Sequence, residues 1–343
     1  MTAYERPPDR PGLRLHLNEN TAGCSPQVLQ RLRSLGASRT GFYPDYGPAR
    51  EAAARWFGVR GDQMILTTGL DEGLFAAAIL ALRGRADGEA IVVDPAFEVY
   101  PAIVEALAGT VVRVRFRPGF VLEAGDVLSA VTARTRLVFL NDPHNPSGAR
   151  IPYPTIRAIA RGAPHAIVFL DEAYAEFAAE SFIDEAVSAF ANVIVGRTFA
   201  KAYGLAGLRL GAVIAAPPLI EALAGIVPPY SVNVYAAEAL TAALADRAYI
   251  DAYVAEAAAS RQMLRDFCAS RSLDAFPSAA NFVLIRVGPG AAAVAAVMAQ
   301  RGVLVRDRSD QPVCDGCIRI TAGWLADTRT ALGALEEALC AAR

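Results

Sequence analysis

The sequence predicts an α/β protein in which a mostly parallel sheet is sandwiched by helices, together with a second, smaller α+β domain. Up to about residue 240, short β-branched runs alternate with alanine- and leucine-rich helical stretches, which is the pattern of a helix-covered parallel sheet. Beyond it, long helices flank shorter strands. The chain has 343 residues and 54% hydrophobic content, enough for two cores. We expect a large domain over 41–240 and a small one formed by 1–40 and 241–343.

The individual elements follow from local signals. The first helix is expected over 25–36, with Ser25 as N-cap, Pro26 at the first position and Gly36 past the end. The segment 64–82 is predicted to be a strand, a Thr-Thr-Gly turn and a helix that opens at Leu70. The other strands are expected at 90–94, 110–116, 136–140, 166–172, 192–196, 209–215, 281–287 and 317–323. Helices are expected at 96–108, 152–161, 234–271 with a break, and 326–342.

Charge and hydropathy exclude several classes of partner. The net charge is −2 and no run of like charges occurs, so we expect neither nucleic acid nor an anionic membrane as partner. The N-terminus is polar and proline-rich, without a signal-peptide core. Because no uncharged apolar run reaches the length of a membrane span, we expect a cytoplasmic protein without a membrane partner.

The cysteines give only a weak signal. Cys314 and Cys317 form a C-x-x-C motif, but there is no second pair, and the three histidines are far away in the sequence. A zinc or dithiol site is therefore less favoured than ordinary reduced thiols, and we expect no metal.

One residue suggests covalent chemistry. Lys201, in the segment RTFAKAYGLAGLRLG, is the only lysine in a chain whose other basic residues are arginine. Arginine can replace lysine on a surface, but its guanidinium stays protonated and cannot offer a neutral amine to a carbonyl carbon. Lys201 lies between Phe199 and Tyr203, in an apolar, glycine-punctuated segment rather than a solvated helix face. The pattern favours a lysine retained for its amine.

Polar residues follow several predicted strands, at the ends where parallel sheets bind ligands. NDPHNPSG (141–148) follows one strand, Asp171 ends the next, and Lys201 comes after the third. The helix expected from Leu70 would expose free backbone N–H groups that suit a phosphate. The acidic Asp71 in its first turn would, however, already compensate the positive end of the helix dipole. An amine, a carboxylate, an asparagine turn, a phosphate-ready helix start and Arg209 together match pyridoxal 5′-phosphate.

These segments resemble the fold-type I pyridoxal-phosphate enzymes, and most closely the histidinol-phosphate aminotransferase branch of the class I/II aminotransferases. The resemblance covers nearly the whole chain. Its motifs are LNEN (17–20), YPDYG (43–47), TTGLDEGL (67–74), DPAFEVY (94–100), NDPHNPSG, DEAYAEF (171–177), RTFAKAYGLAGLRLG, NFVLIR and VLVRDRSDQPVCDGCIRITAG (303–323). It implies that the larger domain binds the cofactor.

The resemblance also implies roles around the cofactor ring. Lys201 would bind the cofactor's aldehyde covalently and later shuttle the substrate proton. Asp171 would face the pyridine nitrogen and keep it protonated. Asn145 and Tyr174 would donate hydrogen bonds to the ring oxygen, and Phe97 would stack on the ring face.

Further residues would hold the phosphate. Thr198, Arg209 and the backbone at Leu70 and Asp71 would bind it from within the subunit. Tyr43 would reach the same phosphate from a neighbouring subunit, which implies a homodimer with shared sites.

The substrate residues are implied in the same way. Arg319 would bind the substrate carboxylate through its planar fork. Arg306 would read the far end of the substrate, including a phosphate, or would instead pair with Asp307 or Asp310. Asn20 of LNEN would also lie at the substrate.

The sequence departs from the family pattern at a few places. Ala200 replaces a serine that commonly precedes the lysine, so one phosphate-binding hydroxyl is absent, with a loss of about one neutral hydrogen bond. Thr21 stands where proline is usual. The N-terminal arm is short, and Tyr4 is its only tyrosine.

The expected activity is transfer of an amino group from histidinol phosphate, or another L-amino acid, to 2-oxoglutarate. An alternative is a pyridoxal-phosphate-dependent decarboxylase of the threonine-phosphate decarboxylase type, although GCIRITAG resembles the aminotransferases more. A cofactor-binding regulatory module fused to a DNA-binding domain would need a helix-turn-helix extension and basic charge, which the chain lacks.

Overall fold

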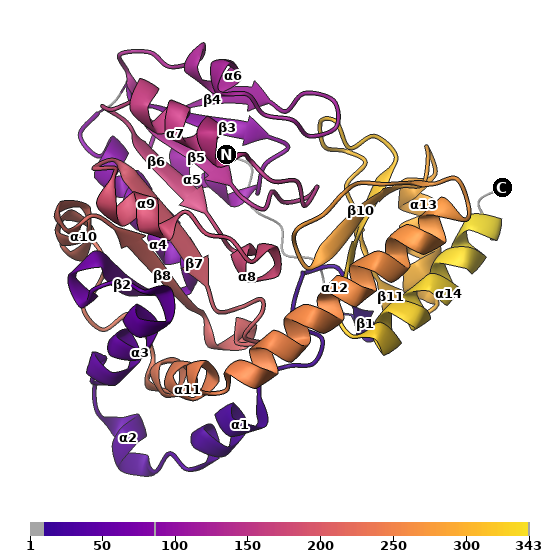
Figure 1. Cartoon of the computed structure of the whole chain (residues 1–343), viewed down its shortest axis with the longest axis horizontal. Helices are drawn as coiled ribbons and strands as arrows, with labels where there is room; N and C mark the ends of the chain where they lie inside the picture. The colour runs from indigo at the N-terminus through magenta and orange to yellow at the C-terminus, as the bar shows by residue number, and fades with distance from the viewer. Residues whose placement is uncertain (1–9, 86, 342–343) are drawn as a thin grey trace.

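The computed structural model describes residues 10–85 and 87–341, so Tyr4 lies outside the described residues. Figure 1 shows two parts: a large, helix-covered sheet on one side and a smaller sheet packed against long helices on the other, with α12 (Arg247–Ala269) running along both. The expected α/β architecture with a second α+β domain is confirmed.

Seven strands form the larger sheet, and all except β8 run in the same direction. The sheet is built mainly from β-branched runs buried on both faces, as expected of covered parallel strands. In spatial order the strands are β2 (Met64–Thr68), β8 (Leu210–Ala215), β7 (Val193–Thr198), β6 (Ile167–Asp171), β5 (Thr135–Asn141), β3 (Glu89–Asp94) and β4 (Thr110–Arg115).

Helices cover both faces of this sheet. Helices α4 and α5 lie on one face, where they contact each other, and α6, α7 and α9 lie on the opposite face. The helices of the larger part are α2 (Ala37–Gly41), α3 (Gly47–Phe57), α4 (Gly69–Leu82), α5 (Val99–Ala106), α6 (Ala124–Leu128), α7 (Tyr153–Gly162), α8 (Ala175–Ala178), α9 (Ile183–Ser188), α10 (Pro217–Ala224) and α11 (Val234–Ala245), with short 3₁₀ turns η1 (Gly61–Gln63) and η2 (Ala206–Leu208).

The smaller domain is built on a four-stranded antiparallel sheet and a separate two-stranded parallel pair. Its long helices α12 and α14 contact each other, and α14 also contacts α13. The elements are β12 (Arg306–Asp307), β13 (Cys317–Thr321), β10 (Phe282–Arg286) and β9 (Asp274–Ala275), the pair β1 (Leu13–Arg14) and β11 (Val303–Leu304), and the helices α13 (Ala291–Gln300) and α14 (Leu325–Ala341).

Two hydrophobic cores broadly match this division, although the larger one extends into the smaller domain through residues such as Tyr253 and Phe282. The N-terminal segment is divided between the two cores. Leu15 belongs to the smaller core, whereas Val28, on α1 (Pro26–Arg33), belongs to the larger one. Helix α1 also packs against α11. We therefore propose that the smaller domain takes only the first part of 1–40 and that α1 counts with the larger domain.

Local signals located the elements well but not every end. Ser25 Oγ accepts a hydrogen bond from the Val28 N–H at 3.4 Å, as expected of an N-cap. The helix ends at Arg33, short of Gly36, because Ser34 closes it by donating to the Arg31 carbonyl at 2.7 Å. The α11–α12 break falls at Asp246, which caps α12.

No helix among the described residues combines the length and apolarity needed to cross a lipid bilayer. Cys314 and Cys317 are free, buried thiols that pack into the larger core.

Candidate active site

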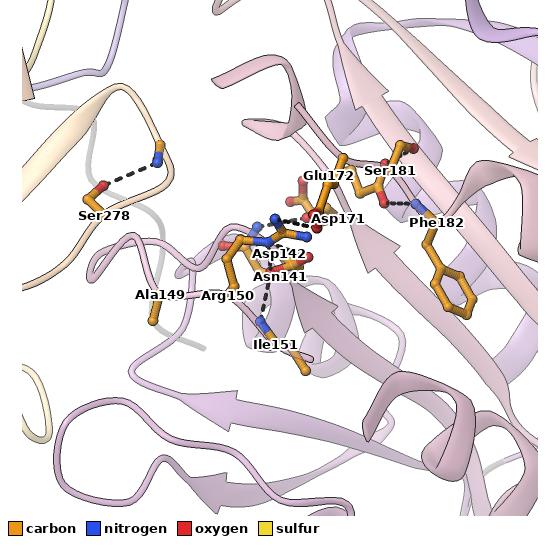
Figure 2. Close-up of polar contacts among 12 residues, drawn as sticks. Asn141, Asp142, Ala149, Arg150, Ile151, Asp171, Glu172, Ser181, Phe182 and Ser278 are labelled. Carbon is orange, nitrogen blue, oxygen red and sulfur yellow. Dashed lines mark hydrogen bonds and ion pairs between the residues drawn. The ribbon is translucent and has the colours of Figure 1, made fainter. Parts of the chain in front are cut away.

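The site lies where the parallel strands β5, β6 and β7 end at one edge of the larger sheet. Asn141 pairs in register with Asp171, and Asp171 with Gly196, two residues before the end of β7. The Asn141 side chain also donates to the Asp171 carbonyl at 2.9 Å. Figure 2 shows Asn141 and Asp171 side by side at the strand ends. As expected from the sequence, their side chains meet at one edge.

Lys201 follows β7 and is partly buried against the N-terminal segment. Its Nζ donates to the Leu17 carbonyl at 2.9 Å and lies 5.8 Å from the centre of the Tyr174 ring. Burial, followed by the positive charge of Arg319, lowers the pKa of Lys201 to about 8. An appreciable share of its amine is therefore neutral near neutral pH.

Asp171 ends β6 as a buried carboxylate with a partner for each oxygen. Oδ1 accepts from the Ala173 N–H at 2.9 Å, and Oδ2 accepts from the Tyr100 hydroxyl at 2.6 Å. Burial raises the pKa of Asp171 to about 6, against the effect of these hydrogen bonds. A cationic group placed beside it would favour the carboxylate form.

Two further acidic residues lie near the Asp171 carboxylate (Figure 2). Asp142 pairs with Arg150 at 2.9 Å and accepts from the Ile151 N–H at 2.8 Å, so it fixes the loop after β5. Glu172 accepts from the Phe182 N–H at 2.6 Å and pairs with buried Arg197 at 3.3 Å. Burial raises the pKa of Glu172 to about 7. These contacts hold the strand ends in place.

Asn145, Arg319 and Tyr174 meet across the two domains. Arg319 is buried on β13, with Nη1 donating to Asn145 Oδ1 and Nη2 donating to the His16 carbonyl at 2.7 Å. Burial, and then the neighbouring Arg308, lower the pKa of Arg319 to about 9. The Tyr174 hydroxyl accepts from Asn18 Nδ2 at 3.1 Å. The small domain therefore places a buried cation at the carboxyl ends of these strands.

The start of α4 packs closely against Arg209. A Cβ at Gly69, where φ is +68°, would lie 2.5 Å from Arg209 Nη2, and one at Gly211 would lie 2.6 Å from the Leu70 nitrogen. The helix begins at Gly69, one residue before the expected Leu70. Asp71 pairs with Arg209 at 2.8 Å. A guanidinium thus lies at the N-terminus of this helix, a position that suits an anion.

Three more predicted residues border this centre. Thr198 ends β7 and its Oγ1 accepts from the Ala200 N–H at 3.2 Å. Phe97 follows β3 and meets the Tyr100 ring edge-on at 5.7 Å. Arg306 lies directly opposite Arg319 in the antiparallel β12–β13 pair.

Two expectations fit the structure less simply. Asn20 uses its side chain on the backbone: Nδ2 donates to the Ala202 carbonyl at 2.9 Å and Oδ1 accepts from the Ala22 N–H at 2.9 Å. This holds the chain beside Lys201 and leaves a direct substrate role without support. Tyr43 is 78% exposed and stacks on Tyr230 at 4.2 Å, and no contact with another predicted site residue is seen for it within the described part of the chain.

The sequence reasoning missed two residues of this centre. Tyr100, which donates to Asp171, is the last residue of DPAFEVY, a motif used only for Phe97. Asn18, which reaches Tyr174, is the first asparagine of LNEN, whose second asparagine was chosen instead. An aromatic hydroxyl next to a strand-end carboxylate could have been expected only once the sheet order was known.

Arg306 has no ion pair among the described residues, so the alternative of a pair with Asp307 or Asp310 is not supported. Asp307 instead accepts from the Ser309 N–H at 2.9 Å and from its hydroxyl at 2.7 Å.

Comparisons with known proteins agree with this geometry. The family model "Aminotransferase class I and II" matches residues 10–335. A histidinol-phosphate aminotransferase of Methanosarcina barkeri is 34% identical over 330 residues, covering 95% of this chain and 88% of that protein. Histidinol-phosphate aminotransferase 2 of Carboxydothermus hydrogenoformans is 36% identical over 318 residues, covering 90% and 86%.

A solved structure shares the fold. Histidinol-phosphate aminotransferase from Sinorhizobium meliloti, crystallised with pyridoxal-5′-phosphate, aligns with a TM-score of 0.88 at 28% identity and covers 97% of this chain and 92% of its own. The matches run through both domains and every element of the strand edge described above. The chain therefore belongs to the class I and II aminotransferase family, whose members are pyridoxal-phosphate-dependent enzymes.

Proposed function

We propose that this protein transfers an amino group from histidinol phosphate, or a closely related amine, to 2-oxoglutarate, with pyridoxal 5′-phosphate as cofactor. The observation that carries the proposal is the single lysine of the chain, partly buried with its pKa lowered to about 8, at the strand edge that also holds Asp171. A neutral amine and a buried carboxylate are the two groups that this cofactor needs from its protein.

The residues present fit the cofactor's three functional ends. The start of α4 beside Arg209 suits a phosphate, because a helix N-terminus favours an anion and a guanidinium can bind one in a charge-assisted pair. Gly69 and Gly211 allow Arg209 and the helix start to approach each other this closely. Asp171 offers a buried carboxylate for a protonated ring nitrogen. Lys201 offers an amine for the aldehyde.

When bound, the cofactor supplies an aldehyde that takes up the amino group and a ring that withdraws electrons from the substrate's α-carbon. The Lys201 Nζ amine would accept the proton from that carbon and return it. Asp171 would hold the protonated ring nitrogen, which would favour its carboxylate form, and the Tyr100 hydroxyl holds Asp171 in position at 2.6 Å. Asn145 and Tyr174 orient the ring oxygen through the amide and the hydroxyl. Thr198 and the backbone of Leu70 and Asp71 complete the phosphate site.

The substrate end is built from arginines. Arg319 is buried and holds its fork beside Asn145, ready for a carboxylate or a phosphate. Arg306 lies opposite it in the sheet and has no acid paired with it in the described part of the chain. Two adjacent guanidiniums favour a dianionic group, which supports a phosphorylated substrate such as histidinol phosphate, the substrate in the relatives' names.

We further propose a homodimer in which Tyr43 serves the partner's cofactor phosphate. Tyr43 stacks on Tyr230 at 4.2 Å, and both rings are exposed together with Phe42. Such a cluster of exposed aromatic rings is typical of a contact surface.

The test follows the cofactor's absorbance during single half-reactions. The protein is mixed with pyridoxal phosphate and then with histidinol phosphate, glutamate, aromatic amino acids or O-phosphothreonine, one at a time. Lys201→Ala and the exposed variant Arg60→Gln are the matched negative and positive controls. We expect conversion to the pyridoxamine form with histidinol phosphate and recovery with 2-oxoglutarate.

Other outcomes change the assignment in defined ways. Conversion only with another donor keeps the aminotransferase and replaces the substrate. Carbon dioxide release from O-phosphothreonine without pyridoxamine formation indicates a decarboxylase. The cofactor proposal fails if Lys201→Ala behaves like the unmodified protein.

A further inference from the structure

A polar cluster lies between the two domains beside Arg319. Arg306 and Arg319 face each other across the antiparallel β12–β13 pair, and the Arg308 N–H continues the ladder by donating to the Cys317 carbonyl at 3.0 Å. Since side chains alternate along a strand, Arg308 projects on the same face as Arg306. Three arginines thus share one face of the small sheet.

Glu98 meets this face from the larger domain. It directly follows Phe97 and precedes α5, and its Oε1 accepts from Arg308 Nη1 at 2.5 Å and from Gln311 Nε2 at 3.1 Å. The Arg308 side chain is 7% exposed. The pair therefore connects the two domains next to the residue expected to stack on the cofactor.

The cluster contains polar atoms that the protein itself leaves unsatisfied. Glu98 Oε2, Gln311 Oε1, Arg308 Nε and Arg319 Nε are buried without a hydrogen-bond partner in the described residues. Buried polar atoms are nearly always bonded, so four in one place point to a ligand. Two are acceptors and two are donors. A molecule that fits must itself both donate and accept hydrogen bonds.

Space for such a molecule adjoins the cluster. Glu98, Arg306 and Gln311 line a cavity of about 460 Å³, which reaches to Asp310 and to the start of α5. Its charged lining consists of four acids and three arginines, Asp94, Glu98, Glu105, Asp310, Arg113, Arg115 and Arg306. The cavity therefore offers both acceptors and donors, and Arg308 adjoins it through its ion pair with Glu98. The cavity can therefore receive the part of a substrate that is remote from the reacting carbon.

We propose that Glu98 and Arg308 select the substrate's remote group: Glu98 accepts a hydrogen bond from an N–H-bearing ring, such as an imidazole, and Arg308 binds the remote carboxylate of a dicarboxylic acceptor. The inference rests on the proposed function, because a transaminase must accept two unlike substrates in one site. Within the ion pair, the Glu98 carboxylate contacts the amino donor and the Arg308 guanidinium contacts the acceptor. Each substrate satisfies a buried atom that the other leaves unpaired.

The experiment measures ligand binding without turnover. Lys201→Ala protein loaded with pyridoxal phosphate is titrated calorimetrically with histidinol phosphate and with 2-oxoglutarate, alone and with Glu98→Gln or Arg308→Gln added. Glutamine keeps the side-chain length of glutamate and removes its charge, whereas in place of arginine it removes the charge and shortens the side chain. Glu123→Gln and Arg117→Gln, which form a surface ion pair, are the matched controls.

Opposite effects are expected from the two variants. Glu98→Gln should weaken the binding of histidinol phosphate by about tenfold, which is the value of one hydrogen bond to a charged group. The same variant should bind 2-oxoglutarate as tightly as before or more tightly. Arg308→Gln should weaken the binding of 2-oxoglutarate by about tenfold and the binding of histidinol phosphate by less than about threefold. If one variant does not fold, the charge-swapped double variant E98R/R308E retains the pair and should lose both preferences.

Equal weakening of both ligands, or no weakening of either, overturns the inference, because a purely structural pair has no reason to discriminate. Failure of Lys201→Ala to bind either ligand also overturns it. Failure of the proposed function is seen separately: the unmodified protein then forms no pyridoxamine with any donor, whatever the binding data show.

Discussion

The lowered pKa of Lys201 can be measured directly, because the chain carries no other lysine. The drop from 10.5 to about 8 corresponds to about 3 kcal/mol at about 1.36 kcal/mol per pKa unit. The ratio of neutral to charged amine is therefore raised about 300-fold. At pH 7 about one tenth of the side chains would be neutral, against about one in 3,000 for an ordinary lysine.

The assay is the rate of acylation by a small anhydride as a function of pH, with the protein free of cofactor. Peptide mass spectrometry separates the Lys201 product from the N-terminal amine, so one residue is followed alone. We expect a midpoint near pH 8. Arg319→Gln should raise the midpoint, yet leave it below 10.5, because burial is the larger cause and Arg319 the second.

An exposed arginine gives the control. Arg60 pairs with Asp62 at 3.0 Å on the surface, and Arg60→Gln should leave the midpoint unchanged. A midpoint near 10.5 in the unmodified protein would refute the reasoning from burial. Equal effects of Arg60→Gln and Arg319→Gln would refute the assignment of the second cause.

Three further substitutions test the residues that support the site. Tyr100→Phe removes the donor to Asp171 and should lower the free energy of unfolding by about 2 kcal/mol at pH 7, measured in urea. Gly69→Ala adds a side chain at φ +68° against Arg209, and fluorescence titration should show at least about tenfold weaker cofactor binding. Glu172 has a raised pKa in the folded protein, so its contribution to stability is present below pH 4.5 and is lost as the pH rises through about 7. Glu172→Gln should therefore gain stability relative to the unmodified protein between pH 5 and 8, and parallel thermal melts that show no relative gain would contradict the assignment.

Much of the fold could be predicted because the sheet of the larger domain is buried on both faces. Strands such as Ile167–Asp171 then appear as uninterrupted apolar runs, and the following polar residue marks the ligand edge. Asp171 was found in this way, whereas Lys201 was found because it is the only lysine of the chain. The division of the N-terminal segment was not, because α1 packs on α11 through tertiary contacts that no local pattern records.

The missed residues act at a distance along the chain. Tyr100 reaches Asp171 across 71 positions, and Asn18 reaches Tyr174 across 156. Neither pairing follows from helix or strand periodicity, which reports only on the nearest few residues. Glu98 and Arg308 are separated by 210 positions, and each alone looks like an ordinary surface charge.

The N-terminal segment that supports Lys201 has a consequence for synthesis on the ribosome. Asn18 bonds Thr321, 303 residues later, and Leu15 pairs with Leu304 and Thr321. The large sheet can therefore form, and Lys201 can take its place on it, while the residues that close the site are still being made. Arg319, which helps lower the pKa of the amine, arrives among the last. A nascent chain would thus carry a less reactive lysine until translation is almost finished.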